Sequence, residues 1–405
     1  MLSATPLQAE ALRDANLSEL KPKPKARAGG DENSLEYGFL AVAIAILAVV
    51  VASADFAVQL PDVGIWREVL FSFAGGCAMN SFFALAIWRN YVSSISTTLA
   101  VGAMALSIPY ILPFEFGISA SALALICFIG VWKALDVAAG TRPHQVVSNG
   151  FGAFATHMAS PVEYRVESSG ECAIVSAERG LWVQMLAQAA SSLAGLGLSA
   201  TLRSRFASER PLVAHCPSCN GALALYAEVW TIFLFLRLFC DTFATLLALG
   251  GYSPQQTFRS PLLRSTSISD FWSRRWNLLI HGLFRRTVFA PLTRHGRVPM
   301  WAAGLVAFSL SGVFHEYSFA LAQPELRRSI GRCFLFFVAQ APVVSAEKLL
   351  ARRLSVPWPM SHSSAACTFA WTLVLVPLAP LFMHPLKTSG VFDQIDMLVP
   401  RLTFE

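Results

Sequence analysis

Residues 299–322 read PMWAAGLVAFSLSGVFHEYSFALA, an apolar run in which a histidine and a glutamate, His315 and Glu316, stand side by side. The run is long enough to cross a bilayer as a helix. Ionisable side chains are costly at that depth, so their presence indicates a working site within the membrane. Histidine changes its charge near neutral pH, which suits proton transfer. The structural alternative is a histidine that a neighbouring helix satisfies and that serves only packing.

The composition indicates a membrane protein. The chain has 405 residues, of which 55% are hydrophobic and only 14% are charged, whereas roughly a quarter of the residues of a soluble protein are charged. Nine apolar runs have the length of a membrane span, near residues 38–60, 66–88, 91–113, 117–138, 181–200, 223–250, 299–321, 331–348 and 364–385. We therefore predict an all-α, multi-pass membrane protein, with about nine transmembrane helices in a single domain over residues 37–400.

The charge distribution predicts the orientation of the chain. Residues 1–36 form a polar tail with a basic cluster at residues 21–27, which we interpret as a disordered cytosolic segment. Residues 251–297 hold eight arginines against one acid, a net charge of +7, and the positive-inside rule places this segment in the cytosol too. The tail and residues 251–297 can both be cytosolic only if the run at 181–200, which is rich in small residues, also crosses the membrane.

Residues 269–286, within this basic segment, carry apolar side chains at helical spacing. The apolar positions are Trp272, Trp276, Leu279, Ile280, Leu283 and Phe284, and the polar positions on the opposite face are Arg274, Asn277, His281 and Arg285. The pattern predicts an amphipathic helix at the cytosolic membrane interface. Two interpretations stay open. The helix is either a plain anchor, or a site for an anionic ligand, because arginine binds phosphates in bidentate fashion.

Two motifs together, FWSRRWN at residues 271–277 and SGVFHEY at residues 311–317, resemble the membrane-bound O-acyltransferase superfamily, and most closely its plant-type wax synthase branch. Members of that branch pair an FWxRRWN-like segment with a later intramembrane histidine. The resemblance is specific over residues 265–320 and rests on hydropathy alone elsewhere. Ser273 is a departure, since this position of the pattern more usually holds glycine.

The resemblance implies transfer of a fatty acyl group from acyl-CoA to the hydroxyl of a long-chain fatty alcohol, which forms a wax ester in the endoplasmic reticulum membrane. It makes His315 the catalytic histidine and Asn277 the second motif residue. A histidine can take the proton of an alcohol as the alcohol attacks a thioester. Asn277 could hydrogen-bond the thioester carbonyl or orient the histidine, and a structural cap is an equal alternative. Acyl-CoA is expected as a co-substrate, and no metal or held cofactor is expected.

Further candidates surround these two residues. Small residues on one side of the His315 helix leave room for a lipid chain or let helices pack closely, and Glu316 could stabilise an imidazolium. The candidates for substrate binding are Trp272, Arg274, Arg275, Trp276, Ser311, Gly312, Glu316 and Gln340. For Gln340, packing is the more expected role. The expected partners are the two substrates and membrane lipids, with no nucleic acid, and a homo-oligomer is left open.

Rival functions follow from the same residues. Diacylglycerol, a sterol or a smaller alcohol could replace the fatty alcohol as acceptor. A transporter could use intramembrane charges such as Lys133 with Asp136 and Arg237 with Asp241, although the chain shows no repeated halves. Spacing on one helix face favours structural pairing of these charges. A catalytically inactive lipid-binding scaffold is the third alternative.

Overall fold

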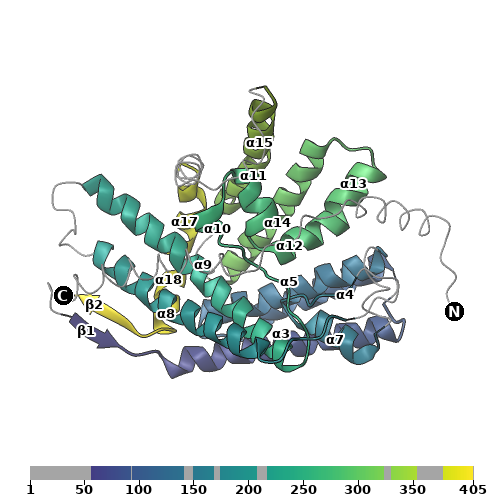
Figure 1. Cartoon of the computed structure of the whole chain (residues 1–405), viewed down its shortest axis with the longest axis horizontal. Coiled ribbons are helices and arrows are strands. Elements are labelled where there is room, and N and C mark those ends of the chain that lie inside the picture. The colour runs from purple at the N-terminus through teal and green to yellow at the C-terminus, as the bar shows by residue number, and fades with distance from the viewer. Residues whose placement is uncertain are drawn as a thin grey trace.

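The computed structural model describes residues 56–92, 94–140, 149–167, 174–207, 217–322, 330–353 and 377–404. Over these residues the chain is a bundle of long helices with short helices between them (Figure 1). The predicted cytosolic tail, most of the run at 38–60 and part of the run at 364–385 lie outside the described residues.

Five of the described helices are long and apolar enough to cross a membrane: α3 (Val63–Trp88), α5 (Gly117–Ala138), α8 (Leu181–Ala207), α9 (Pro217–Leu249) and α15 (Arg332–Arg353). The run at 181–200 thus forms a helix of the predicted kind. Two other apolar runs form α4 (Ile95–Ile111), which is shorter, and α14 (Met300–Ala322), whose hydropathy is lowered by its His-Glu-Tyr triplet. The helical membrane class is confirmed, and the count of nine spans stays a prediction.

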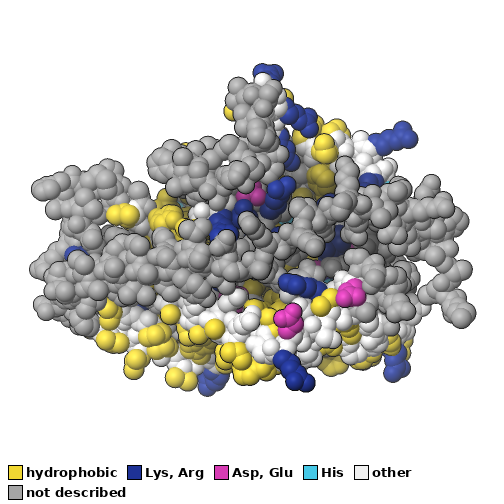
Figure 2. Space-filling view, viewed as in Figure 1, with side chains coloured by type: hydrophobic (Ala, Val, Ile, Leu, Met, Phe, Trp, Pro, Cys, Tyr) yellow, Lys and Arg dark blue, Asp and Glu magenta, His cyan; other side chains and the backbone are white. Residues whose placement is uncertain are grey.

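The bundle separates helices that face inward from helices that face outward. The central helix α5 has 78% of its apolar span buried, whereas α3 has 28%. Large apolar side chains of α3, such as Leu70, Phe71 and Phe82, are exposed. Figure 2 shows hydrophobic side chains along the lower edge of the view, where Figure 1 places α3. Exposed apolar side chains on such a helix are suited to contact with lipid.

A close contact joins α3 to α5. The side chain of Asn80 donates through Nδ2 to the carbonyl of Ile126 at 3.0 Å. A Cβ on Gly130 would lie 1.9 Å from Oδ1 of Asn80, so only glycine allows this approach. Elsewhere in the bundle α8 packs along α9, and α14 packs on both α5 and α15.

Of the charge pairs expected inside the membrane, one is confirmed. Arg237 and Asp241 pair at 3.3 Å on α9, and Asp241 also accepts from Ser192 of α8 at 2.9 Å. Lys133 donates to the carbonyls of residues 157 and 160, both at 2.6 Å, while Asp136 accepts from Arg286 at 2.8 Å. These two α5 charges therefore bind other segments, and their direct pairing stays a prediction.

The two ends of the described chain meet. Strand β1 (Phe56–Gln59) pairs antiparallel with β2 (Arg401–Phe404), a small sheet that the all-α prediction did not include. The short helices α17 (Ala379–Thr388) and α18 (Val391–Met397) precede β2, whereas α7 (Phe151–Ala159) packs on α3 and α5.

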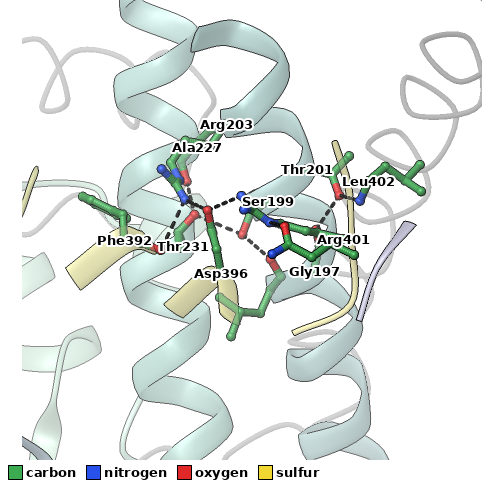
Figure 3. Close-up of polar contacts among 12 residues, drawn as sticks. Gly197, Ser199, Thr201, Arg203, Ala227, Thr231, Phe392, Asp396, Arg401 and Leu402 are labelled. Carbon is green, nitrogen blue, oxygen red and sulfur yellow. Dashed lines mark hydrogen bonds and ion pairs between the residues drawn. The ribbon is translucent and has the colours of Figure 1, made fainter. Parts of the chain in front are cut away.

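A buried carboxylate holds the C-terminal segment on α8 (Figure 3). Asp396 of α18 accepts from both Arg203 of α8 and Arg401 of β2, and the backbone N–H of Leu402 donates to Oγ1 of Thr201 at 3.1 Å. Burial raises the pKa of Asp396, and the two guanidinium groups oppose that rise. Ion pairing therefore offsets part of the desolvation of this carboxylate.

Candidate active site

Residues 268–289, which we call the signature segment, consist of short helices. They are α11 (Ile268–Asp270), the π-helix η1 (Phe271–Arg275), α12 (Leu278–Phe284) and the π-helix η2 (Arg285–Phe289), followed by α13 (Ala290–Arg294). The prediction of one continuous amphipathic helix is therefore wrong. The backbone is extended at Trp276 and left-handed at Asn277, with φ 42° and ψ 62° for Asn277. The spacing of the apolar residues gave no sign of this break.

Asn277 makes this break possible. Asparagine tolerates the left-handed region better than most residues, and Oδ1 of Asn277 accepts from the backbone N–H of Ile280 at 3.3 Å. The side chain therefore caps the start of α12, as the structural alternative proposed. Among the described residues the Asn277 side chain forms this one hydrogen bond, through Oδ1, so its amide N–H groups remain available to a ligand in the cavity that Asn277 lines.

The signature segment contributes side chains from both of its predicted faces to one cavity. Leu279 and Leu283 are buried in the core on the apolar side. The polar residues Arg274, Asn277, His281 and Arg285 all line a cavity, as do Trp272 and Trp276. Residues of both predicted faces therefore border this ligand-sized space, with Asn277 and His281 half-buried and Arg274 and Arg285 exposed.

This cavity has a volume of about 1160 Å³ and is lined mainly by apolar side chains of the signature segment, α5, α9, α14, α15 and the C-terminal helices. Pockets for small ligands are smaller, at about 300–1,000 Å³. A space of this size and character can hold long hydrocarbon chains.

His315 lines the same cavity, together with Gly304, Ser311 and Ser318 of α14. Nδ1 of His315 lies 2.8 Å from the backbone carbonyl of Ser311. A carbonyl can only accept, so Nδ1 carries the proton and Nε2 keeps its lone pair. Histidine and asparagine, distant in sequence, therefore share one cavity, and the histidine is in the tautomer that can act as a base through Nε2.

Four of the predicted site residues lie outside the cavity wall: Arg275, Gly312, Glu316 and Gln340. Arg275 pairs with Asp270 at 2.6 Å and donates to the carbonyl of Arg259 at 3.3 Å. The guanidinium of Arg275 thus stabilises the fold of the signature segment, whereas the adjacent Arg274 lines the cavity.

Gly312 and Glu316 form the contact between α14 and α15. A Cβ on Gly312 would lie 2.9 Å from Cα of Phe334, so glycine lets the two backbones approach. Glu316 accepts from the backbone N–H of Phe334 at 2.9 Å and satisfies a free donor in the first turn of α15. Of the small residues of α14, Gly312 therefore serves close helix packing. Gly304 and Ser311 line the cavity instead.

Gln340 is fully buried in α15 behind the cavity wall. Its Oε1 accepts from Nε1 of Trp272 at 3.1 Å, and its Nε2 donates to the carbonyl of Phe336 at 3.1 Å. Its contact is therefore with a cavity-lining tryptophan.

Two cations of α15 were not predicted from the sequence as site residues. Lys348 and Arg352 line the cavity, as do Arg274 and Arg285, and all four side chains are exposed. None of the four makes an ion pair or a side-chain hydrogen bond with another described residue, and no described residue that lines the cavity is acidic. The spacing of four residues between Lys348 and Arg352 places both on one helix face, a signal that could have found them. Figure 2 shows Lys and Arg side chains over the upper part of this face, where Figure 1 places α11, α12 and α15.

Comparisons with known proteins agree with the two motifs. Residues 254–339 match the membrane bound O-acyl transferase family. The chain is 33% identical over 180 residues to probable long-chain-alcohol O-fatty-acyltransferase 1 of Arabidopsis thaliana, covering 42% of this chain and 49% of that protein. It is 35% identical over 177 residues to acyl-CoA–sterol O-acyltransferase 1 of the same plant, covering 42% and 50%.

A third relative is diacylglycerol O-acyltransferase 1B of Glycine max, 31% identical over 116 residues, or 29% of this chain and 21% of that protein. The chain thus spans about half the length of the Arabidopsis relatives and less of the soybean protein. These matches confirm the resemblance to the membrane-bound O-acyltransferases and to their plant wax synthase branch.

Proposed function

We propose that this chain, a relative of the membrane-bound O-acyltransferases, transfers a fatty acyl group from acyl-CoA to the hydroxyl of a long-chain alcohol and so forms a wax ester. The observation that carries the proposal is that His315 and Asn277 line one large apolar cavity whose charged lining residues are all cationic. We place the reaction in the endoplasmic reticulum membrane, with the N-terminal tail in the cytosol.

In the proposed reaction His315 acts as the general base. Its Nε2 accepts the proton of the alcohol while the alcohol oxygen attacks the thioester carbonyl carbon. The carbon–sulfur bond then breaks, and the imidazolium returns the proton to the coenzyme A thiolate. The amide of Asn277 donates from Nδ2 to the carbonyl oxygen as that oxygen becomes negative. The same side chain keeps its Oδ1 bond to Ile280 at 3.3 Å, which holds the amide in place.

The cationic side chains of the cavity are suited to bind the coenzyme A part of acyl-CoA. Arg274, Arg285, Lys348 and Arg352 have no competing carboxylate on the cavity wall within the described residues. Coenzyme A carries several phosphate charges, which guanidinium and ammonium groups bind well. We therefore assign these four side chains to the phosphates and the apolar lining to the acyl chain and the alcohol.

The choice of acceptor follows the relatives and the lining. The relatives are named for long-chain alcohols, sterols and diacylglycerol, all of them lipid-soluble hydroxyl compounds. The long-chain alcohol is our first assignment because the motifs resemble the wax synthase branch most closely. A sterol or diacylglycerol is the alternative, which the same cavity volume allows.

The proposal is tested in membranes that contain the full chain, supplied with labelled acyl-CoA and a panel of long-chain alcohol, sterol and diacylglycerol. Wild type should form ester with the long-chain alcohol, and His315→Ala should form almost none. His295→Ala is the matched control, because His295 is exposed and lies outside the cavity lining. Ester formation by His315→Ala at the wild-type rate would show that His315 is not the general base. A wild-type chain that acylates no acceptor would overturn the function.

A further inference from the structure

The signature segment needs support from outside itself. Its helices α11 and η1 have three and five residues, and the backbone then leaves the helical region at Trp276. Helices this short are not stable alone in water, because the first turn fixes several residues for one hydrogen bond. Catalysis by Asn277 with His315 of α14 nevertheless requires a fixed geometry between the two.

One face of α15 supplies that support at two points. The carboxylate of Glu347 accepts from the backbone N–H groups of Ile268 at 2.9 Å and Ser269 at 2.8 Å, where the signature segment begins. Two turns earlier, Gln340 accepts from the indole N–H of Trp272 at 3.1 Å. Seven residues along a helix bring two side chains to the same face, so both bonds reach the segment from one side of α15.

The same helix also contacts the histidine. Phe337, three residues before Gln340, stacks on the His315 ring with centroids 4.3 Å apart and planes at 29°. Trp272 packs against Phe337 with a centroid distance of 5.9 Å. Helix α15 is thus in direct contact with both parts of the candidate active site, while Gln340 itself lies outside the cavity lining.

We propose that Gln340 and Glu347 are positioning residues, which hold the signature segment in register with His315 by binding Trp272 and the start of α11. The inference rests on the proposed function. Neither side chain lines the cavity, so neither is expected to touch a substrate. Gln340 acts through Trp272, and Glu347 acts through the backbone of residues 268 and 269. Loss of either contact should slow the chemical step more than it weakens substrate binding.

A double-mutant cycle tests the Gln340 contact. Gln340→Leu removes the acceptor, and Trp272→Phe removes the indole donor while keeping an aromatic ring. Each should lower kcat by roughly tenfold, the size expected when a bond that aligns reacting groups is lost, and KM for acyl-CoA should change by less than about twofold. If Gln340 acts through Trp272, the double variant loses no more kcat than either single variant. Additive losses, or a Trp272→Phe variant with wild-type kcat, would overturn the proposal.

Glu347 is tested with a matched pair of variants. Glu347→Gln replaces one acceptor oxygen by a donor and should lower kcat, and Glu347→Asp should restore part of it because the carboxylate is retained. Glu178→Gln makes the same chemical change at an exposed site and should leave kcat unchanged. Wild-type kcat in Glu347→Gln would refute this half of the proposal. If wild type forms ester in the same assay, the proposed function holds, and an unchanged kcat in the variants then counts against the positioning role alone.

Discussion

The ring of Phe337 lies stacked on the imidazole of His315, with centroids 4.3 Å apart and an angle of 29° between the planes. The stack joins α15 to α14, whose backbones approach closely at Gly312. With Nδ1 bonded to the Ser311 carbonyl at 2.8 Å, the ring is restrained both in its plane and across its face. The orientation of the proposed general base is thus held before any substrate binds.

Phe337→Leu should lower kcat, because leucine fills much of the space without the stacked ring. An aromatic contact contributes about 0.5–1.5 kcal/mol beyond burial, so a decrease of up to roughly tenfold is expected. Leu335→Ala is the control, since Leu335 lies on the same helix with 54% of its side chain exposed. Initial rates at saturating substrates measure the effect, and equal rates for wild type and Phe337→Leu would show that the stack does not restrain the base.

Substitutions of the adjacent arginines Arg274 and Arg275 should affect different properties, substrate binding for Arg274 and stability for Arg275. Arg274 lines the cavity and has no ion-pair partner among the described residues, so Arg274→Gln should raise KM for acyl-CoA. Arg275 pairs with Asp270 at 2.6 Å, so Arg275→Gln should mainly lower thermal stability, because it leaves a nearly buried carboxylate unpaired. Kinetics and thermal unfolding of both variants in detergent check the assignment. The reverse pattern would contradict it.

Lys348 and Arg352 should contribute to binding of the coenzyme A phosphates. The double change Lys348→Gln with Arg352→Gln should raise KM for acyl-CoA and weaken its dependence on ionic strength, since exposed charges are screened by salt. Arg353→Gln is the matched control, because Arg353 is the exposed neighbour outside the cavity lining. The assignment fails if Arg353→Gln and the double variant raise KM equally.

Stability should decrease in mild acid because of His281. Burial, together with Arg285 and Arg286, lowers the pKa of His281 from its ordinary 6.5. The folded protein therefore binds fewer protons at this site than the unfolded chain, so the free energy of unfolding falls as the pH drops through about 6.5. Melting temperatures at about pH 7.5 and about pH 5.5 should differ less in His281→Gln than in wild type. His295→Gln, a change at an exposed histidine, should behave as wild type.

Asp396→Asn should destabilise the C-terminal segment. Arg203 and Arg401 would both lose their shared carboxylate, and breaking a buried ion pair from one side costs about 3–5 kcal/mol. Asp393→Asn, an exposed acid of the same helix, is the control. Thermal unfolding in detergent measures the difference, and equal melting temperatures for the two variants would show that the Asp396 ion pairs do not stabilise the fold.

Much of the fold could be predicted because hydropathy and helical period are local properties. The runs at 66–88, 117–138, 181–200, 223–250 and 331–348 all correspond to helices long and apolar enough to span. The break at Asn277 could not be predicted, because the same spacing fits one helix or two. A left-handed residue there depends on a side-chain cap and on the packing of Trp276 against Phe271.

The sequence by itself determined the membrane class and the helical runs, and its two motifs selected His315 and Asn277 as the candidate residues. These features depend on the chemistry of single residues and on their spacing along the chain. Only the tertiary structure decided that Arg274 lines the cavity while Arg275 pairs with Asp270, and that Lys348 and Arg352 join it from α15. Neighbouring residues on a helix point in different directions, and residues far apart in sequence can meet, as Trp272 meets Gln340 and Ile268 meets Glu347. The packing of α15 on the signature segment therefore sets these roles.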